Sequence, residues 1–467
     1  MGLLIKDGEI VTADARCHAD IYIANETITS IGLDLQVPAE TEVIDANGKL
    51  IFPGFIDPHV HIHLPFMATF AKDTHATASV AALIGGTTTF IEMVCPSRGE
   101  DALEGYHKWK QKAEGTSACD YAFHMGVTHY DAGTEAQLRE IVKDGTASFK
   151  IFLSYKGFFG VDDNEMFRVL KLAAELGVIT TAHCENSELV SQMQHALLAA
   201  GKTGPEWHEP SRPEAIEAEG TSRFATFVEQ TGATGYVVHL SCAPALHAAV
   251  EAKLRGVKLY VESVVPHFLL DKSYAELPGV EGMKHVMSPP LRDKSNQQVL
   301  WSSLETRLID TVGTDHCPFD TGQKLLGAND FTQIPNGIPG IEERINLMYT
   351  YGVNRGRLNI HRFVDALSTQ PAKLFGLFPR KGTIAVGSDA DLVIYDQEYR
   401  GILTAAKQHT NNDYCGFEGF AIEGRPSVVM VRGKVQVRDG VFIGDQGRGL
   451  FLRREPQYQK HEVADAC

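Results

Sequence analysis

The middle of the chain repeatedly alternates a strand with a helix, and this alternation limits the fold more than any other feature. Residues 76–83 show helical periodicity, Gly85 and Gly86 end that segment, and residues 87–93 have a β-branched strand pattern. In a second unit Asp163 is the expected N-cap, the helix ends at Gly177, and residues 178–182 form a strand. Further strands are expected at residues 51–57, 121–127, 148–154, 235–240, 259–262 and 310–314. With eight such strands, the sequence predicts an α/β fold, a (β/α)8 TIM-like barrel.

Short strand patterns separated by turns occupy both ends of the chain. They lie at residues 3–6, 9–11, 21–24 and 27–31, and again at residues 391–395, 428–431, 434–437 and 441–443. Because all-β segments flank a different middle, we expect the two ends to meet in one small β-sandwich domain. The expected domains are residues 1–52 and 379–450 for the two parts of the sandwich and residues 53–378 for the barrel. Residues 451–467 would be a C-terminal tail, either flexible or bridging subunits.

Charge and composition limit the partners and the compartment. The 43 Lys and Arg residues are outnumbered by 59 Asp and Glu, and no basic cluster follows one face, so nucleic acid is not an expected partner. The first residues contain no apolar run long enough for a signal peptide or a membrane span, which favours a cytoplasmic protein without membrane association. The eight cysteines contain no CxxC pair, and we expect most of them to be small buried residues.

Residues that commonly bind metals lie at five of the expected strand ends. They are His59 and His61, Lys150, His183, His239 and Asp315. Catalytic residues of α/β barrels lie at the C-terminal ends of the strands, so these side chains should converge there. A spacing of two also directs the first two imidazoles to the same face of their strand. Any one of these histidines alone fits an ordinary core residue, but the whole set suits zinc or a similar divalent ion.

Lys150 is unusual because Phe149 and Ile151 flank it in a strand that should be buried. An unpaired ammonium there would cost several kcal/mol. Two explanations are open at this point. A carboxylate could pair with the ammonium, or the neutral amine could react with carbon dioxide to form a carbamate that bridges two cations.

Eight sequence strings, in order along nearly the whole chain, resemble the hydantoinase and dihydropyrimidinase branch of the amidohydrolase superfamily. They are PGFIDPHVHIHLPF, SFKIFLSYK, TAHCEN, VVHLS, MSPPLR, GTDHCPF, IPNG and GSDADLVIYD. The resemblance implies a barrel with a β-sandwich built from both termini, and a homotetramer. It implies two divalent ions per chain, with Zn²⁺ favoured, bound by His59, His61, carboxylated Lys150 (N6-carboxylysine), His183, His239 and Asp315. In this assignment His59, His61 and Asp315 bind one ion, His183 and His239 bind the other, and the lysine carbamate, formed with carbon dioxide, bridges both.

The same resemblance assigns roles around the metals. Asp315 would be the catalytic base and then the acid, and Tyr155 would stabilise the oxyanion. Tyr155, Ser288 and Asn336 match the substrate-contact positions of the family. Five apolar residues fit an ordinary core, but the resemblance implies that some of them are lid and pocket side chains around a substrate substituent; they are Leu64, Phe66, Phe152, Phe159 and the neighbouring Phe158.

The activity that this resemblance implies is hydrolysis of the cyclic amide bond of 5,6-dihydropyrimidines and 5-substituted hydantoins, giving N-carbamoyl amino acids. An allantoinase-like or other cyclic ureide hydrolase is the alternative. Related dihydroorotases, and to a degree allantoinases, tend to carry an arginine shortly after the paired histidines, whereas residues 62–66 here contain none. A non-enzymatic assembly protein of the collapsin-response type is disfavoured because those relatives lack most of the metal ligands.

Four further histidines are left out of the predicted site. His63 lies beyond the expected strand end, and His316 should point away from Asp315. His124 and His129 have no partner that the sequence reveals.

Overall fold

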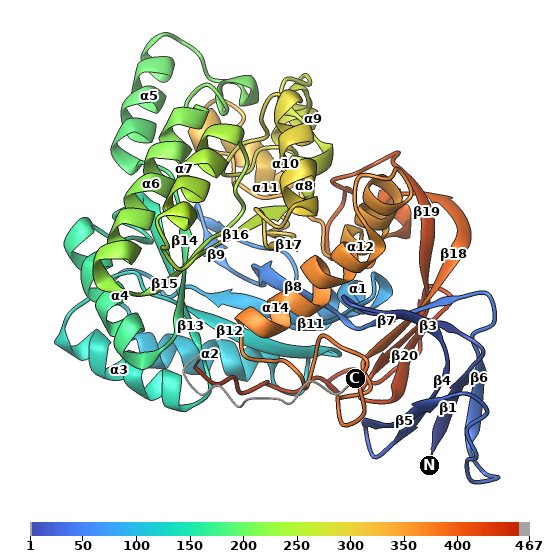
Figure 1. Ribbon diagram of the computed structural model, residues 1–467. Helices are drawn as coiled ribbons and strands as arrows, with labels where there is room; N and C mark the ends of the chain where they lie inside the picture. Colours follow the sequence, from blue (N-terminus) through green and yellow to red (C-terminus); the bar gives the residue numbers. More distant parts are fainter. Residues whose placement is uncertain (1, 457–467) are drawn as a thin grey trace.

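Eight parallel strands form the centre of the computed structural model, which describes residues 2–456 (Figure 1). Their order in the sheet is β17-β16-β15-β14-β13-β12-β11-β8. The strands are β8 (Phe55–Val60), β11 (Thr87–Val94), β12 (Asp120–Gly126), β13 (Ser148–Lys156), β14 (Ile179–His183), β15 (Thr234–Val237), β16 (Leu259–Val264) and β17 (Thr311–Gly313). The two outer strands meet, because the amide of Asp315 donates to the carbonyl of His59 (3.0 Å) and the amide of His61 donates to the carbonyl of His316 (2.8 Å). The predicted barrel is therefore confirmed.

Helices follow the barrel strands along the chain and pack around them (Figure 1). They are α1 (His75–Ile84), α2 (Ala102–Ala113), α3 (Ala132–Lys143), α4 (Asp163–Leu176), α5 (Ser187–Ala199), α6 (Glu214–Thr231), α7 (Ala243–Leu254), α8 (Val265–Leu269), α9 (Val280–Met283), α10 (Ser295–Glu305), α11 (Thr321–Lys324), α12 (Arg344–Met348), α13 (Ile360–Val364) and α14 (Gln370–Leu374). The N-cap of α4 is Asp162, one residue before the predicted cap, because the Asp162 side chain accepts from the Glu165 amide and forms a capping box. Gly177 ends α4 with φ 69°, as its sequence position suggested.

Two sheets from the chain termini pack beside the barrel. One contains β1 (Leu3–Lys6), β4 (Asp20–Ala24), β5 (Thr27–Gly32) and β6 (Glu42–Asp45). The other contains β2 (Glu9–Val11), β3 (Arg16–His18), β7 (Leu50–Pro53), β18 (Leu392–Ile402), β19 (Ala421–Val431), β20 (Lys434–Arg438) and β21 (Val441–Phe442). Ile5 and Ile21 of the first sheet share a buried cluster with Ile51, Leu392 and Met430 of the second. The two termini thus build one sandwich, as predicted.

The predicted strand at residues 51–57 is wrong as a single element. The structure divides it at Gly54 into β7, which belongs to the sandwich, and β8, which begins the barrel. A Cβ atom at residue 54 would lie 2.1 Å from Thr88 Oγ1. Only glycine therefore fits where the chain leaves one sheet and enters the next.

The first part of the predicted C-terminal tail packs on the barrel. The Leu452 amide donates to the Tyr121 carbonyl (2.7 Å), and the Arg454 amide donates to the Gly145 carbonyl (2.8 Å). The Arg454 guanidinium is buried and donates to Ser148 Oγ (2.9 Å). Residues 451–456 are therefore not a free tail, and the rest of the predicted tail lies outside the described residues.

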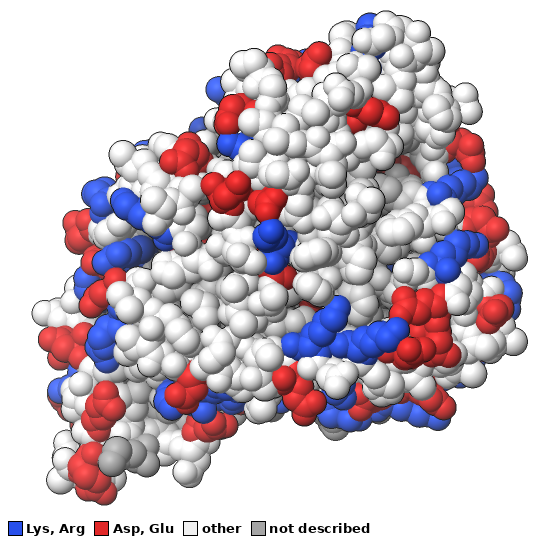
Figure 2. Space-filling model, turned by 180° about the vertical axis from the view of Figure 1, so that it is seen from behind, with Lys and Arg blue, Asp and Glu red and all other residues white. Residues whose placement is uncertain are grey.

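Charged side chains of both signs are distributed over the surface. On the face in Figure 2, Lys and Arg lie among Asp and Glu instead of gathering into one basic patch. Within residues 2–456, no helix is long and apolar enough to cross a membrane. The described cysteines are all free, with Cys17 exposed and the other six buried.

A small hairpin of β9 (Pro65–Phe66) and β10 (Thr69–Phe70) follows the first barrel strand. It places the apolar side chain of Phe66 over the mouth of the barrel, near Tyr155 and Phe159.

Candidate metal centre

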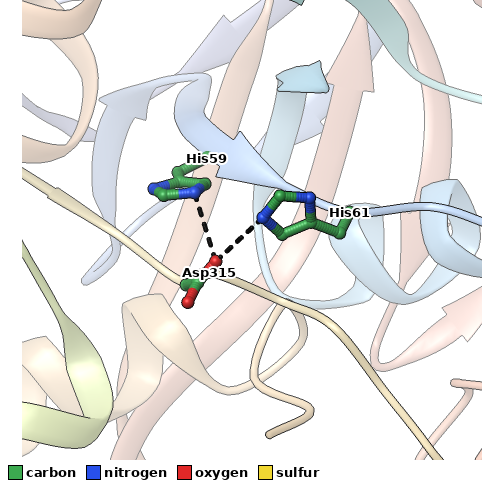
Figure 3. Close-up of side chains that lie close together, drawn as sticks. All are labelled: His59, His61 and Asp315. Carbon is green, nitrogen blue, oxygen red and sulfur yellow. Dashed lines mark ion pairs between the residues drawn. The ribbon is translucent and has the colours of Figure 1, made fainter. Parts of the chain in front are cut away.

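The paired histidines and the aspartate meet where the barrel closes (Figure 3). Asp315 Oδ1 lies 3.1 Å from His59 Nε2 and 3.0 Å from His61 Nε2. The three ligand atoms lie within 4.8 Å of one another, and all three residues are buried. His59 is inside β8, whereas His61 and Asp315 lie just beyond their strands. Closure of the barrel therefore brings together ligands that are more than 250 residues apart in the sequence.

The charges of these three groups depend on one another. Burial opposes a charge on His59, but the carboxylates of Glu262 and Asp315 outweigh it and raise its pKa to about 9. Burial lowers the pKa of His61 to about 4, although Asp315 opposes this. Burial also opposes ionisation of Asp315, yet the two imidazoles hold its pKa well below the ordinary value. Asp315 is thus an ionised carboxylate over the whole neutral range.

The second pair of predicted ligands also meets. His183 is the last residue of β14, and His239 follows β15, the next strand of the barrel. His183 Nδ1 lies 3.0 Å from His239 Nε2. The ring of His239 stacks on that of His59, with 5.4 Å between the ring centroids. His239 has φ 40°, a left-handed conformation that a non-glycine residue rarely adopts. This backbone turn directs the imidazole into the same space as the first pair.

Lys150 lies at the same level of the barrel, although not at the end of its strand. It is the third residue of the long strand β13 and pairs with Gly126, the last residue of β12, and with Thr181. The side chain has 0 % exposure, and its Nζ has no hydrogen-bond partner among the described residues. Burial lowers its pKa below the ordinary lysine value. The carboxylate partner that one explanation required is not present in the described part of the chain.

The six residues form a donor set that fits divalent metal ions. Four imidazoles and one carboxylate supply the nitrogen and oxygen ligands that zinc and related ions prefer. Lys150 Nζ is a buried polar atom without a hydrogen bond among the described residues, and such an atom requires another partner. The geometry thus fits a metal group at this end of the barrel.

Two buried glutamates that the sequence reasoning missed orient these ligands. His59 Nδ1 donates to Glu262 Oε1 (2.7 Å), and Glu262 Oε1 also accepts from the His239 amide (3.1 Å). His183 Nε2 donates to Glu185 Oε2 (2.7 Å), which in turn accepts from Arg212 (2.6 Å). Carboxylates behind metal-binding histidines fix ring orientation and raise ligand basicity. Glu185 lies in the string TAHCEN, two residues after His183, so the sequence could have identified it as a residue near the metal ligands.

A pocket opens directly onto the ligand set, and all three predicted substrate contacts line it. The Asn336 side-chain amide donates to Ser288 Oγ (2.9 Å) and to the Tyr155 hydroxyl (3.4 Å). Tyr155 has φ 59° and lies near the end of β13. The predicted apolar residues that line the pocket are Leu64, Phe66, Phe152 and Phe159, together with Cys317, which sequence reasoning missed. Phe158 is 39 % exposed and does not line the pocket.

The four histidines left out of the predicted site have other environments. His316 Nε2 bonds Asp73 (2.9 Å), so its ring points away from the metal ligands, as expected. His63 has φ 53° and packs its ring against Phe70. The ring nitrogens of His124 bond Ser148 Oγ (2.6 Å) and the Pro58 carbonyl (2.9 Å), and His129 Nε2 bonds Thr134 Oγ1 (3.0 Å).

Comparisons with known proteins agree with this arrangement. Residues 50–436 match the model of the Amidohydrolase family. The solved structure of a D-hydantoinase (dihydropyrimidinase) from Thermus sp. is 73 % identical, covers 98 % of this chain and 100 % of its own, and has a TM-score of 0.97. The D-hydantoinase of Geobacillus stearothermophilus is 42 % identical over 97 % of both chains. The dihydropyrimidinase of Rattus norvegicus is 37 % identical over 97 % of this chain and 89 % of its own. The chain belongs to the hydantoinase and dihydropyrimidinase family of amidohydrolases.

Proposed function

We propose that this enzyme hydrolyses the cyclic amide bond of 5-substituted hydantoins and 5,6-dihydropyrimidines and releases N-carbamoyl amino acids. One observation carries the proposal: five of the six candidate metal ligands line the same pocket as the three candidate substrate contacts, and the sixth, His59, lies 3.1 Å from the pocket residue Asp315. Relatives named D-hydantoinase and dihydropyrimidinase, similar over nearly the whole chain, support it.

The ligand set would bind two divalent ions. His59, His61 and Asp315 would hold one ion, and His183 and His239 the other. We propose that Lys150 carries a carbamate that bridges them. In forming it, the neutral Nζ attacks the carbon of carbon dioxide and loses a proton, and burial favours the neutral amine that this step needs. When bound, such a pair of ions activates a water nucleophile and polarises the substrate carbonyl.

Asp315 would transfer the proton during ring opening. Its carboxylate is ionised because two imidazoles lie 3.1 and 3.0 Å from Oδ1, so it can accept the proton of the attacking water. The same group then delivers that proton to the ring nitrogen as the C–N bond breaks. A base that becomes the acid of the next step leaves the enzyme in its starting protonation state.

Tyr155 would stabilise the developing oxyanion. Burial raises the pKa of its phenol, which therefore keeps its proton at neutral pH. Its oxygen accepts from the Asn336 amide, which leaves the phenolic hydrogen available for the substrate.

The pocket walls favour a neutral ring with an apolar substituent. Leu64, Phe66, Phe152 and Phe159 give the pocket apolar walls, and it is also lined by Ser288 and Asn336, which we propose hold the imide edge of the ring. No arginine is among the described residues that line the pocket. A substrate carboxylate would therefore lack a bidentate partner, which disfavours dihydroorotase-like activity and gives an allantoinase-like activity no support.

Purified protein tests the proposal. It should open dihydrouracil or a 5-substituted hydantoin faster than allantoin, hold about two divalent ions per chain, and lose activity to a strong chelator. Full activity in the metal-free protein would contradict the metal mechanism, and turnover of allantoin alone would contradict the substrate assignment.

We also propose a homotetramer that acts in the cytoplasm, as the family resemblance implies. Light scattering on the purified protein tests the oligomeric state, and fractionation of the source cells tests the location.

A further inference from the structure

Lys324, the last residue of α11, is a buried lysine outside the candidate metal centre. Its side chain has 0 % exposure. The ammonium donates to three backbone carbonyls, those of Val286 (3.0 Å), Pro335 (2.7 Å) and Gly337 (2.7 Å). These three bonds use all the donors of the group. Within residues 2–456 it forms no ion pair with a carboxylate, so the charge is balanced by carbonyl dipoles.

Such an arrangement is costly to maintain. Burial of a charged group disfavours folding unless the group is well paired, and here burial lowers the pKa of Lys324 to about 7. A methionine or leucine of similar volume would fill the same space without that cost. The ammonium therefore has a use that an apolar side chain cannot serve.

The three carbonyls belong to the two segments that present the candidate substrate contacts. Pro335 and Gly337 are the immediate neighbours of Asn336, and Val286 lies two residues before Ser288. The same segments are joined directly, because the Gly337 amide donates to the Val286 carbonyl (2.9 Å). The ammonium thus ties together the two backbones whose separation determines where a ring can be held.

The other side of the Ser288 segment is held independently. His208 Nε2 bonds the carbonyl of Met287 (2.8 Å), the residue between Val286 and Ser288. At Gly337 an added Cβ would lie 2.2 Å from the Cys317 carbonyl, so this segment is also packed tightly against the pocket wall. Lys324 adds a side-chain link to the direct hydrogen bond between two segments that are each supported elsewhere.

We propose that Lys324 is a positioning residue that sets the spacing of Ser288 and Asn336 for recognition of the substrate ring. It does not line the pocket and does not touch the candidate metal ligands. Its loss should therefore weaken substrate binding and leave the metal centre intact. The inference rests on the proposed function, because it assumes that these two residues hold the ring.

Lys324→Met tests this role, since it keeps the volume and leaves three carbonyls without a donor. We expect KM for the best cyclic amide to rise by about 10-fold or more, with kcat changed by less than about 3-fold and two ions per chain retained. Lys324→Gln keeps an amide donor, so its KM should lie between those of Lys324→Met and the wild type. Lys381 provides a matched control, since it is also buried but pairs with Asp120 (2.6 Å) and Asp391 (2.7 Å), away from the pocket. Lys381→Met should lower Tm without raising KM.

The possible results separate this inference from the proposed function. Wild-type protein that opens no cyclic amide would overturn the proposed function and this inference with it. An active wild type with unchanged KM in metal-loaded Lys324→Met would overturn the inference alone. An equal rise of KM in Lys381→Met, loss of metal from Lys324→Met, or failure of both Lys324 variants to fold would show a general structural role and would overturn it too.

Discussion

Lys150→Met should stabilise the metal-free protein and destabilise the metal-loaded one. In the structure Lys150 Nζ is buried with no hydrogen bond among the described residues. An unsatisfied buried polar group costs about 1–3 kcal/mol, and methionine fills nearly the same volume without it. In chelator, the variant should therefore be more stable than the wild type by about 1–3 kcal/mol, or about 1–3 °C in Tm for a chain of 467 residues.

With metal and bicarbonate present, the wild type should be more stable than Lys150→Met. A ligand that binds only the folded state adds about 4 kcal/mol when its free concentration is ~1,000-fold above Kd. The wild type should gain this stabilisation through the proposed carbamate, whereas Lys150→Met lacks the bridging group and should bind little metal. Thermal unfolding in chelator and in zinc with bicarbonate measures both states, and elemental analysis gives the metal content.

Lys381→Met is the matched control for this reversal. Lys381 is buried like Lys150 but is paired with Asp120 and Asp391, and breaking a buried pair costs about 3–5 kcal/mol. This variant should be less stable than the wild type with and without metal. Two results would contradict this prediction: Lys150→Met holds two ions per chain with chelator-sensitive activity, or it is destabilised in chelator as Lys381→Met is.

Three further predictions test other groups. Asp315→Asn should lower kcat by ~10²-fold or more, since a positioned base contributes at least that much, and near wild-type turnover would remove Asp315 from proton transfer. Tyr155→Phe should lower kcat by ~10²-fold with metal content unchanged, because it removes one oxyanion donor; an unchanged kcat would exclude that role. Burial raises the pKa of Glu343 to about 7 from 4.5, so the folded state keeps a proton that the unfolded state loses between those values, and stability falls as pH rises through this window. Glu343→Gln should remove this loss. The variant should be more stable than the wild type by on the order of 3 kcal/mol at pH 8 but not at pH 4.5. As a control, replacement of the exposed Glu140 by Gln should change Tm relative to the wild type equally at pH 4.5 and at pH 8.

The sequence alone determined the barrel, the sandwich and the six candidate ligands. These features depend on local patterns, because strand and helix periodicity, turn residues and the position of a side chain after a strand can all be read within about ten residues. His183 and His239 lie where these patterns placed them, at the ends of neighbouring strands. The family resemblance then linked these local signals into one expected activity.

Tertiary structure alone decided which groups support the site. Gly54 divides an apparently continuous strand because a side chain of another strand occupies the space of its Cβ. Lys150 reaches the level of the histidines through the stagger of β13 against β12, which no local pattern encodes. The partner of His59 is Glu262, 203 residues away, and the partners of Lys324 are backbone carbonyls, which carry no residue-specific signal. Contacts of this kind arise only when the barrel closes, because closure brings distant segments within hydrogen-bond distance.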